Sequence, residues 1–320
     1  MKRSMIQRTA VMGAMLLVLV FATAAASEKE KYEEPFEKTL SLAKDGKVQI
    51  SNISGDIEVR SWSEGQVKVK ALKVSKASSL SQAKENAAKV TIEISQEGNV
   101  LRIETKYPKS GKFWEGESVN VSVDYWLWIP EQAGLKVKNI SGDVDVEGTA
   151  GMLDLSAISG DVSLRKASGR AESSTISGDL EISDVTGDVL LKSVSGDITA
   201  GRIKGSIEAE TVSGDIELTE VSEAATVRVK ALSGEIVYRG KINPAGNYSL
   251  KSHSGDVELD LPADSAFDFE AETFSGGIVT DFEIKVTGKI SPKEMSGVVN
   301  GGGATVKLSS FSGDIKLKKT

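Results

Sequence analysis

A nine-residue pattern of turn residues and apolar residues runs without a gap from residue 141 to residue 221. Most units open with Ser-Gly-Asp or a variant of it. Positions 4, 6 and 9 are apolar except at Thr149 and Ser173, and positions 5, 7 and 8 are mostly polar. Glycine at position 2 permits the positive φ angle that a tight turn often needs. Apolar residues at positions 4 and 6 direct one face of a short strand inward. Each unit therefore predicts one turn and one strand.

Full Ser-Gly-Asp turns alternate with weaker Ala-Gly and Ser-Gly turns up to residue 186. This alternation predicts a coil of about eighteen residues with two strands and two turns, because one unit cannot bury its apolar face alone but stacked coils can. Beyond residue 221 the intervals grow to 18–21 residues and then 37, with loops expected at NPAGN and TGKISPKEMSGVVNGGG. The predicted fold class is all-β: a parallel β-solenoid of about 18–21 residues per coil.

The N-terminal third lacks this regular period. QVKVKALKV, VTIEIS, NVLRIETKY and SVNVSVDYWLWIP predict strands. Residues 79–90 predict one short helix with Ser78 or Ser79 as its cap, and its apolar face would hold Leu80, Ala83, Ala87 and Val90. An open solenoid end exposes unpaired backbone and core, so we expect residues 27–135 to form a β-rich cap and residues 136–320 to form the solenoid. Lysines in IKLKKT predict a last strand that resists pairing at the far end.

The first 26 residues are typical of an export signal. Lys2, Arg3 and Arg8 precede an uncharged apolar stretch, and Ala24 and Ala26 fit an Ala-x-Ala cleavage site. An uncleaved membrane anchor is the alternative. The chain has no cysteine, which excludes disulfides and a lipid-bearing N-terminal cysteine. We therefore expect a secreted, extracytoplasmic protein of the periplasm or cell surface, with no membrane insertion after signal cleavage.

Charge narrows the choice of partners. Removing three basic residues with the signal takes the 39 Lys and Arg residues to 36, against 46 Asp and Glu residues, a net charge of −10. A chain of this charge is a poor partner for nucleic acid or an anionic membrane. The expected partner is an unidentified envelope protein or a polysaccharide.

Four further segments carry a family resemblance: VQISNISGDIEVRSW, VSVDYWLWIP, SGDVELDLPAD and GGGATVKLSSFSGDIKL. In this order, around the run of Ser-Gly-Asp repeats, they make the chain resemble the bacterial putative-adhesin domain family of unknown function over roughly residues 36–320. The resemblance implies a β-solenoid on exported or envelope proteins. It implies no established activity and no catalytic residues.

An eighteen-residue coil aligns the repeated acids along one edge. Like charges about 4.8 Å apart repel by roughly 1 kcal/mol per neighbouring pair even in water. We expect each carboxylate to accept hydrogen bonds from backbone N–H groups of its own or the next turn. The alternative is a row of cations, although the motif departs from the calcium-binding nonapeptide, which places its aspartate at position 6. The ladder comprises Asp143, Asp161, Asp179, Asp197, Asp215 and Asp256, with Glu235 also in the line.

Catalysis is not expected. His253 is the only histidine and sits in an ordinary position before a turn, so no Ser-His or Cys-His arrangement can be argued. We expect no cofactor. In VSVDYWLWIP the strand alternation places Trp126 and Trp128 on one face, opposite Tyr125, Leu127 and Ile129. The favoured interpretation buries the tryptophans as end cover, and the alternative makes them a site for sugar rings.

These features favour an exported, non-enzymatic β-solenoid that presents a repetitive surface for binding or adhesion at the cell envelope. An envelope accessory or sensor protein that contacts a signalling partner is the second hypothesis. A polysaccharide-active enzyme is the third, since a glycosidase needs only two suitably spaced carboxyl groups.

Overall fold

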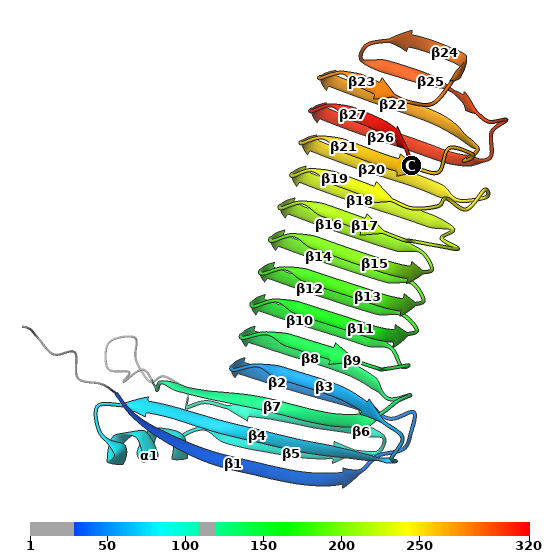
Figure 1. Cartoon of the computed structure of the whole chain (residues 1–320). Helices are drawn as coiled ribbons and strands as arrows, with labels where there is room; N and C mark the ends of the chain where they lie inside the picture. The colour runs from blue at the N-terminus through cyan, green and yellow to red at the C-terminus, as the bar shows by residue number, and fades with distance from the viewer. Residues whose placement is uncertain (1–28, 109–118) are drawn as a thin grey trace, which may run out of the picture.

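The computed structural model describes residues 29–108 and 119–320 and forms one elongated β-stack (Figure 1). The expected export signal at residues 1–26 and Trp114 lie outside the described residues. Within the described ranges, no helix has the length and apolarity that crossing a membrane requires.

Two sheets face each other along the stack, and each contains eleven parallel strands. These counts leave out the antiparallel strands, which are β1 (Glu30–Ser41) and β4 (Gln66–Ala77) in the 13-stranded sheet A and β5 (Thr91–Glu97), β24 (Lys285–Ser291) and β25 (Glu294–Val299) in the 14-stranded sheet B. In sheet A the parallel order is β7 (Val121–Pro130), β3 (Ile57–Trp62), β9 (Val144–Glu147), β11 (Val162–Ser168), β13 (Leu180–Thr186), β15 (Ile198–Lys204), β17 (Ile216–Thr219), β19 (Ile236–Arg239), β21 (Val257–Leu261), β27 (Ile315–Lys319) and β23 (Ile278–Thr280). In sheet B it is β6 (Val100–Lys106), β2 (Lys47–Ser54), β8 (Gly134–Ser141), β10 (Leu153–Ser159), β12 (Ala171–Ser177), β14 (Val189–Ser195), β16 (Ile207–Ser213), β18 (Thr226–Ser233), β20 (Asn247–Ser254), β26 (Ala304–Ser312) and β22 (Phe267–Ser275).

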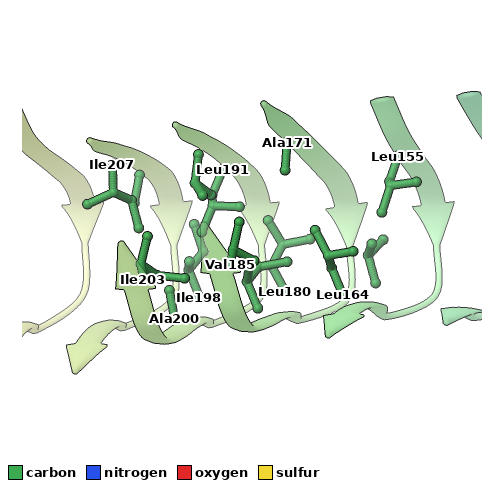
Figure 2. Close-up of a cluster of buried hydrophobic side chains, with 14 of the residues drawn as sticks. Leu155, Leu164, Ala171, Leu180, Val185, Leu191, Ile198, Ala200, Ile203 and Ile207 are labelled. Atoms are coloured by element: carbon green, nitrogen blue, oxygen red, sulfur yellow. The ribbon is translucent and has the colours of Figure 1, made fainter. Parts of the chain in front are cut away.

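The stacking register confirms the predicted coil. Val162 pairs with Val144 on one side and Leu180 on the other, a shift of eighteen residues each way. All three side chains are buried, at 1% exposure or less. Figure 2 shows the inward side chains of the two sheets meeting in one interior. The fold is a parallel β-solenoid whose core is almost entirely aliphatic in its regular section.

Glycine at the turn is required for two reasons. Gly178 has φ of 151°, in the region that side chains rarely adopt. A Cβ on Gly178 would also lie 2.2 Å from the carbonyl oxygen of Gly160 in the neighbouring coil. The repeat therefore fixes both the turn conformation and the close contact between successive turns.

The ninth position of the repeat has two different environments. In the five sheet A units, the eighth residue adopts a left-handed conformation, and this returns the ninth residue to the core. Gly148 has φ of 82°, and the four other cases, Lys166, Asp184, Arg202 and Glu220, have φ between 53° and 57°. In sheet B units the strand alternates regularly, so position 8 faces inward and position 9 faces solvent. The apolar ninth residue is therefore a core residue only in alternate units.

The N-terminal end is closed by antiparallel strands. β4 (Gln66–Ala77) and β1 (Glu30–Ser41) extend sheet A beyond β7, and β5 (Thr91–Glu97) extends sheet B beyond β6. The predicted helix is α1 (Leu80–Ala88), capped by Ser79, which accepts a hydrogen bond from the Gln82 N–H. Ala83, Ala87 and Val90 are buried, whereas Leu80 is 45% exposed. The parallel stack extends into the region assigned to the cap, because the coil of β2 and β3 lies between β6–β7 and β8–β9.

The C-terminal end differs from the sequence prediction in two ways. The last strand, β27, is not an edge strand: it pairs with both β21 and β23, so the last coil of the chain lies inside the stack (Figure 1). Lys316 instead forms an ion pair with Asp256, which directly precedes β21, and Lys318 forms one with Glu258 of β21. The stretch expected to be a loop contains a hairpin of β24 (Lys285–Ser291) and β25 (Glu294–Val299), which closes sheet B.

Candidate binding surfaces

The Ser-Gly-Asp turns form one edge of the stack, and their carboxylates are tied to the backbone. Asp143 Oδ1 accepts a hydrogen bond from the Asp161 N–H at 2.9 Å. The same bond recurs along the edge at 2.8 Å in each case. Asp161 accepts from the Asp179 N–H, Asp179 from the Asp197 N–H and Asp197 from the Asp215 N–H. This is the local backbone role expected for the repeated acids. It offsets the repulsion between neighbouring carboxylates with charge-assisted bonds.

The acidic edge is longer than the sequence pattern indicated. Asp124 accepts from the Asp56 N–H, and Asp56 accepts from the Asp143 N–H, which extends the line at one end. At the other end Asp256 accepts from the Asp314 N–H at 2.8 Å. Burial raises the pKa of Asp124. The Ser-Gly-Asp copies at 54–56 and 312–314 were the available signal for Asp56 and Asp314, but no motif marks Asp124.

The carbonyl groups of these turns are bonded from inside the stack. Thr175 Oγ1 donates to the Gly160 oxygen at 3.2 Å, and Ser252 and Ser310 make equivalent bonds to Gly234 and Gly255. In most ladder carboxylates, one oxygen accepts a hydrogen bond from the backbone N–H of the next turn. No cluster of three or more candidate metal ligands occurs among the residues that the structure describes. The cation row remains a hypothesis without geometric support.

The two tryptophans of β7 lie on the outer face of sheet A. Tyr125, Leu127 and Ile129 point inward, as the alternation predicts. Trp126 is 36% exposed, and the ammonium groups of Lys68 and Lys70 each lie 5.8 Å from the ring centre of Trp128. The tryptophan face is therefore not buried as end cover. The reason is that β4 pairs beside β7 in the same sheet and does not cross its outer face.

A continuous row of exposed side chains crosses the outer face of sheet B. The row lies one residue before each Ser-Gly-Asp turn or its equivalent, and its members occupy adjacent strands in register. We name it the apolar strip. Its ten members are Ile53, Ile140, Ile158, Ile176, Val194, Val212, Leu232, His253, Phe311 and Phe274. The nine apolar members are between 40% and 67% exposed.

Charged residues flank the middle of the apolar strip. A shallow groove of about 570 Å³ follows it there, lined by Lys192, Val194, Val212, Lys230, Leu232 and Lys251 among others. Lys230 forms an ion pair with Glu210 at 2.7 Å. On the opposite side of the strip lies the acidic edge, two residues beyond the serine of each turn. The strip thus has a lysine-rich side and an aspartate side.

The C-terminal end of the strip is aromatic. Phe311 stacks on His253 and on Phe274, with ring centres 4.8 Å apart in both pairs and interplanar angles of 12° and 4°. Lys293 lies over the other side of Phe274, 5.8 Å from its ring centre. His253 is therefore part of a stacked surface row, a setting that its position before a turn did not reveal.

The sequence did not predict the apolar strip, because an apolar residue at the ninth position of the repeat is typical of a core residue. Its only sequence signal is the residue in front of each Ser-Gly-Asp turn. That residue is Ile158 in one unit and buried Ala167 in the next, so the pattern alone does not separate strip from core.

Comparisons with known proteins found one family model and several similar solved structures. The family model described as Toastrack DUF4097 matches residues 45–318. No curated protein matches the chain. Among solved structures, a putative adhesin from Bacteroides fragilis is 13% identical, with 88% of this chain and 96% of that chain covered and a TM-score of 0.41. A putative lipid binding protein from Parabacteroides distasonis is 12% identical, with 89% and 97% covered and a TM-score of 0.37. A putative cell adhesion protein from Clostridium sporogenes is 12% identical, with 90% and 100% covered and a TM-score of 0.24.

Proposed function

Because this chain belongs to the Toastrack DUF4097 family, whose model matches most of its length, we propose that it is an exported, non-enzymatic β-solenoid that presents a repetitive surface for binding or adhesion at the cell envelope. The observation that carries this proposal is the eleven-coil parallel stack, because each outward position of the repeat recurs once per coil. Repeated groups at about 4.8 Å spacing suit an extended partner such as a polysaccharide or a filamentous envelope protein.

The distribution of titratable groups supports a binding role over catalysis. The carboxylates of the acidic edge recur at every turn and hold backbone N–H groups, as between Asp161 and Asp179. Ion pairs on the outer faces also join neighbouring coils at different places along the stack, as between Arg202 and Asp184 and between Lys230 and Glu210. Such repetition is typical of a scaffold, whereas a catalytic site needs a few groups that converge on one substrate position.

The export part of the proposal is tested on cells that express the full chain. We expect the protein in the extracytoplasmic fraction, with a mature N-terminus at Ser27 by mass spectrometry. An intact Met1 in the membrane fraction would contradict it and favour the sensor hypothesis.

The binding part is tested with envelopes isolated from the same cells. We expect purified protein to sediment with them in a saturable manner, and a glycan array followed by product analysis to separate binding from cleavage. Release of shortened glycan would refute the non-enzymatic assignment.

A further inference from the structure

The apolar strip is larger than an ordinary surface patch. Seven apolar side chains from Ile53 to Leu232 form one uninterrupted line, and Phe311 and Phe274 continue it beyond His253. These nine side chains are 40% to 67% exposed. With roughly 150–250 Å² of surface for each large side chain, the exposed area of the strip is on the order of 800 Å². Monomeric proteins rarely expose contiguous apolar areas beyond about 300–600 Å², and a standard interface buries about 800 Å² per partner. The strip is therefore the size of one side of a protein interface.

The spacing of the strip restricts what can cover it. Neighbouring strands place its side chains about 4.8 Å apart over ten coils. An extended peptide presents same-side residues about 6.6 Å apart, and an α-helix repeats every 5.4 Å, so both lose register within a few rungs. A second solenoid with the same strand spacing stays in register over the whole length.

The aromatic end argues against a sugar platform. Sugar rings pack on open aromatic faces, but both faces of Phe311 are covered by His253 and Phe274. The outer face of Phe274 is approached by the Lys293 ammonium. The row consequently presents ring edges, which suit packing against other apolar side chains.

We propose that the apolar strip is a homodimer interface, on which a second copy of this chain docks side by side with its coils running in the same direction. The charges on the two sides of the strip set this direction. Lys192, Lys230 and Lys251 lie on one side, where Glu210 pairs with Lys230 and leaves a net positive charge, and the acidic edge lies on the other. A twofold axis parallel to the strip brings the lysine side of each copy against the aspartate side of its partner. An axis that reverses the partner would place aspartate against aspartate.

This inference does not depend on the envelope role, since it concerns only the surface of the folded chain. Its first test is sedimentation equilibrium of the protein purified from cells that express the full chain. The expected species has twice the mass of one chain. A monomer at every concentration tested would overturn the proposal, and a monomer that sediments with phosphatidylcholine vesicles would overturn it in favour of a lipid surface.

The matching variant carries Ile158→Thr, Ile176→Thr, Val194→Thr and Val212→Thr. Threonine keeps the strand preference of the outward positions, so the thermal midpoint should stay near that of the parent. The dimer dissociation constant should rise by at least about 100-fold. The control carries Val237→Thr and Val279→Thr on the outer face of sheet A and should dimerise like the parent.

The direction of the partner is tested with single cysteines, because the chain has none of its own. In a parallel dimer, Ile176→Cys and Leu232→Cys should each form a disulfide-linked homodimer on oxidation, since equivalent rungs face each other. In a reversed dimer these two variants would cross-link only when mixed with one another, and that result would overturn the proposed arrangement.

Charge pairing is tested with Asp161→Asn, Asp179→Asn and Asp197→Asn in one chain. Asparagine keeps one oxygen that can accept the next backbone N–H and replaces the other carboxylate oxygen by an uncharged NH2 group. The dissociation constant should rise about 10-fold at low salt and by less at high salt. Tighter dimerisation of this variant would indicate aspartate against aspartate and would refute the parallel arrangement.

Discussion

Sheet A and sheet B are built from the same nonapeptide, yet its last apolar residue is buried in one and exposed in the other. Ile203 in sheet A is fully buried, whereas Val194 in sheet B is 44% exposed. The difference lies in one backbone conformation, the left-handed eighth residue of sheet A units such as Arg202. A single torsion thus decides whether a repeat adds to the core or to a surface.

The largest test of this comparison places a charge at the ninth position of each sheet. Ile203→Asp buries an unpaired carboxylate and should lower the free energy of unfolding by more than about 4 kcal/mol. Val194→Asp adds the same group on the outer face and should cost less than about 1 kcal/mol in the monomer. Urea denaturation measures both. Similar losses at the two positions would show that the faces are not distinct.

The turns at the two edges should behave alike, in contrast to the ninth positions. Gly178→Ala and Gly187→Ala would each place a Cβ within 2.2 Å or less of a carbonyl oxygen in the next coil, at φ of 151° and 139°. We expect each to cost about 3 kcal/mol or more in urea denaturation. Gly98→Ala is the control for φ alone, since its φ is 57° and no atom lies within 4 Å of the added Cβ.

An unpaired buried hydroxyl group in sheet B allows a substitution that should stabilise the fold. Ser173 is fully buried between Leu155 and Leu191, and its hydroxyl has no hydrogen-bond partner. Ser173→Val should raise the free energy of unfolding by about 1–2 kcal/mol, because it removes an unpaired polar atom and fills the core. A lower thermal midpoint would contradict this account.

Glycine at the eighth position should have opposite effects in the two sheets. Glu220 has φ of 54°, so Glu220→Gly should relieve strain and stabilise by up to about 1 kcal/mol. Thr211 is buried in a regular sheet B strand, and Thr211→Gly should destabilise by about 1 kcal/mol or more. If both glycine substitutions changed the free energy of unfolding in the same direction, the left-handed conformation would not be the cause of the difference between the sheets.

The smallest expected effect concerns acid stability. A hydrogen bond from the Lys316 ammonium lowers the pKa of Asp256 below its usual value. A lowered folded-state pKa adds stability above the unfolded pKa, near pH 4, and this is lost as pH falls through the folded value. Lys316→Met should reduce the acid sensitivity of the thermal midpoint below pH 4, with little change from Val237→Thr, which touches neither group. An unchanged acid profile would argue that solvent screens the pair fully.

The sequence predicts the repetitive part of this fold well, because the repeat encodes it directly. The eighteen-residue coil, the inward pairs such as Val162 and Leu164, and a helix cap at Ser78 or Ser79 follow from spacing and residue type. The left-handed conformation does not, since Lys166, Asp184, Arg202 and Glu220 share no residue type that demands it. The apolar strip, which depends on this difference, could therefore not be read from the pattern.

The two ends were less predictable because they depend on long-range pairing. The lysines of the last strand predicted an edge strand, but Lys316 and Lys318 form ion pairs with Asp256 and Glu258, which lie at and within the neighbouring strand β21. A partner some sixty residues away leaves no periodic signal in the sequence. The position of β2 and β3 is equally hard to predict. They precede β6 and β7 in the chain, but in the stack they lie between β6–β7 and β8–β9.

Both the first and the last coil of the chain are thus enclosed by segments from elsewhere in the sequence. Neither terminus can unravel one rung at a time, because β2–β3 and β26–β27 each have a neighbouring coil on both sides. A pulling force on the C-terminal strand β27 must separate it from β21 and β23 together, and at the N-terminal end the coil of β2 and β3 stays enclosed even after β1 is removed from β4. When the chain emerges N-terminus first, its first coil stays incomplete until residues near 147 arrive, so folding cannot simply follow translocation.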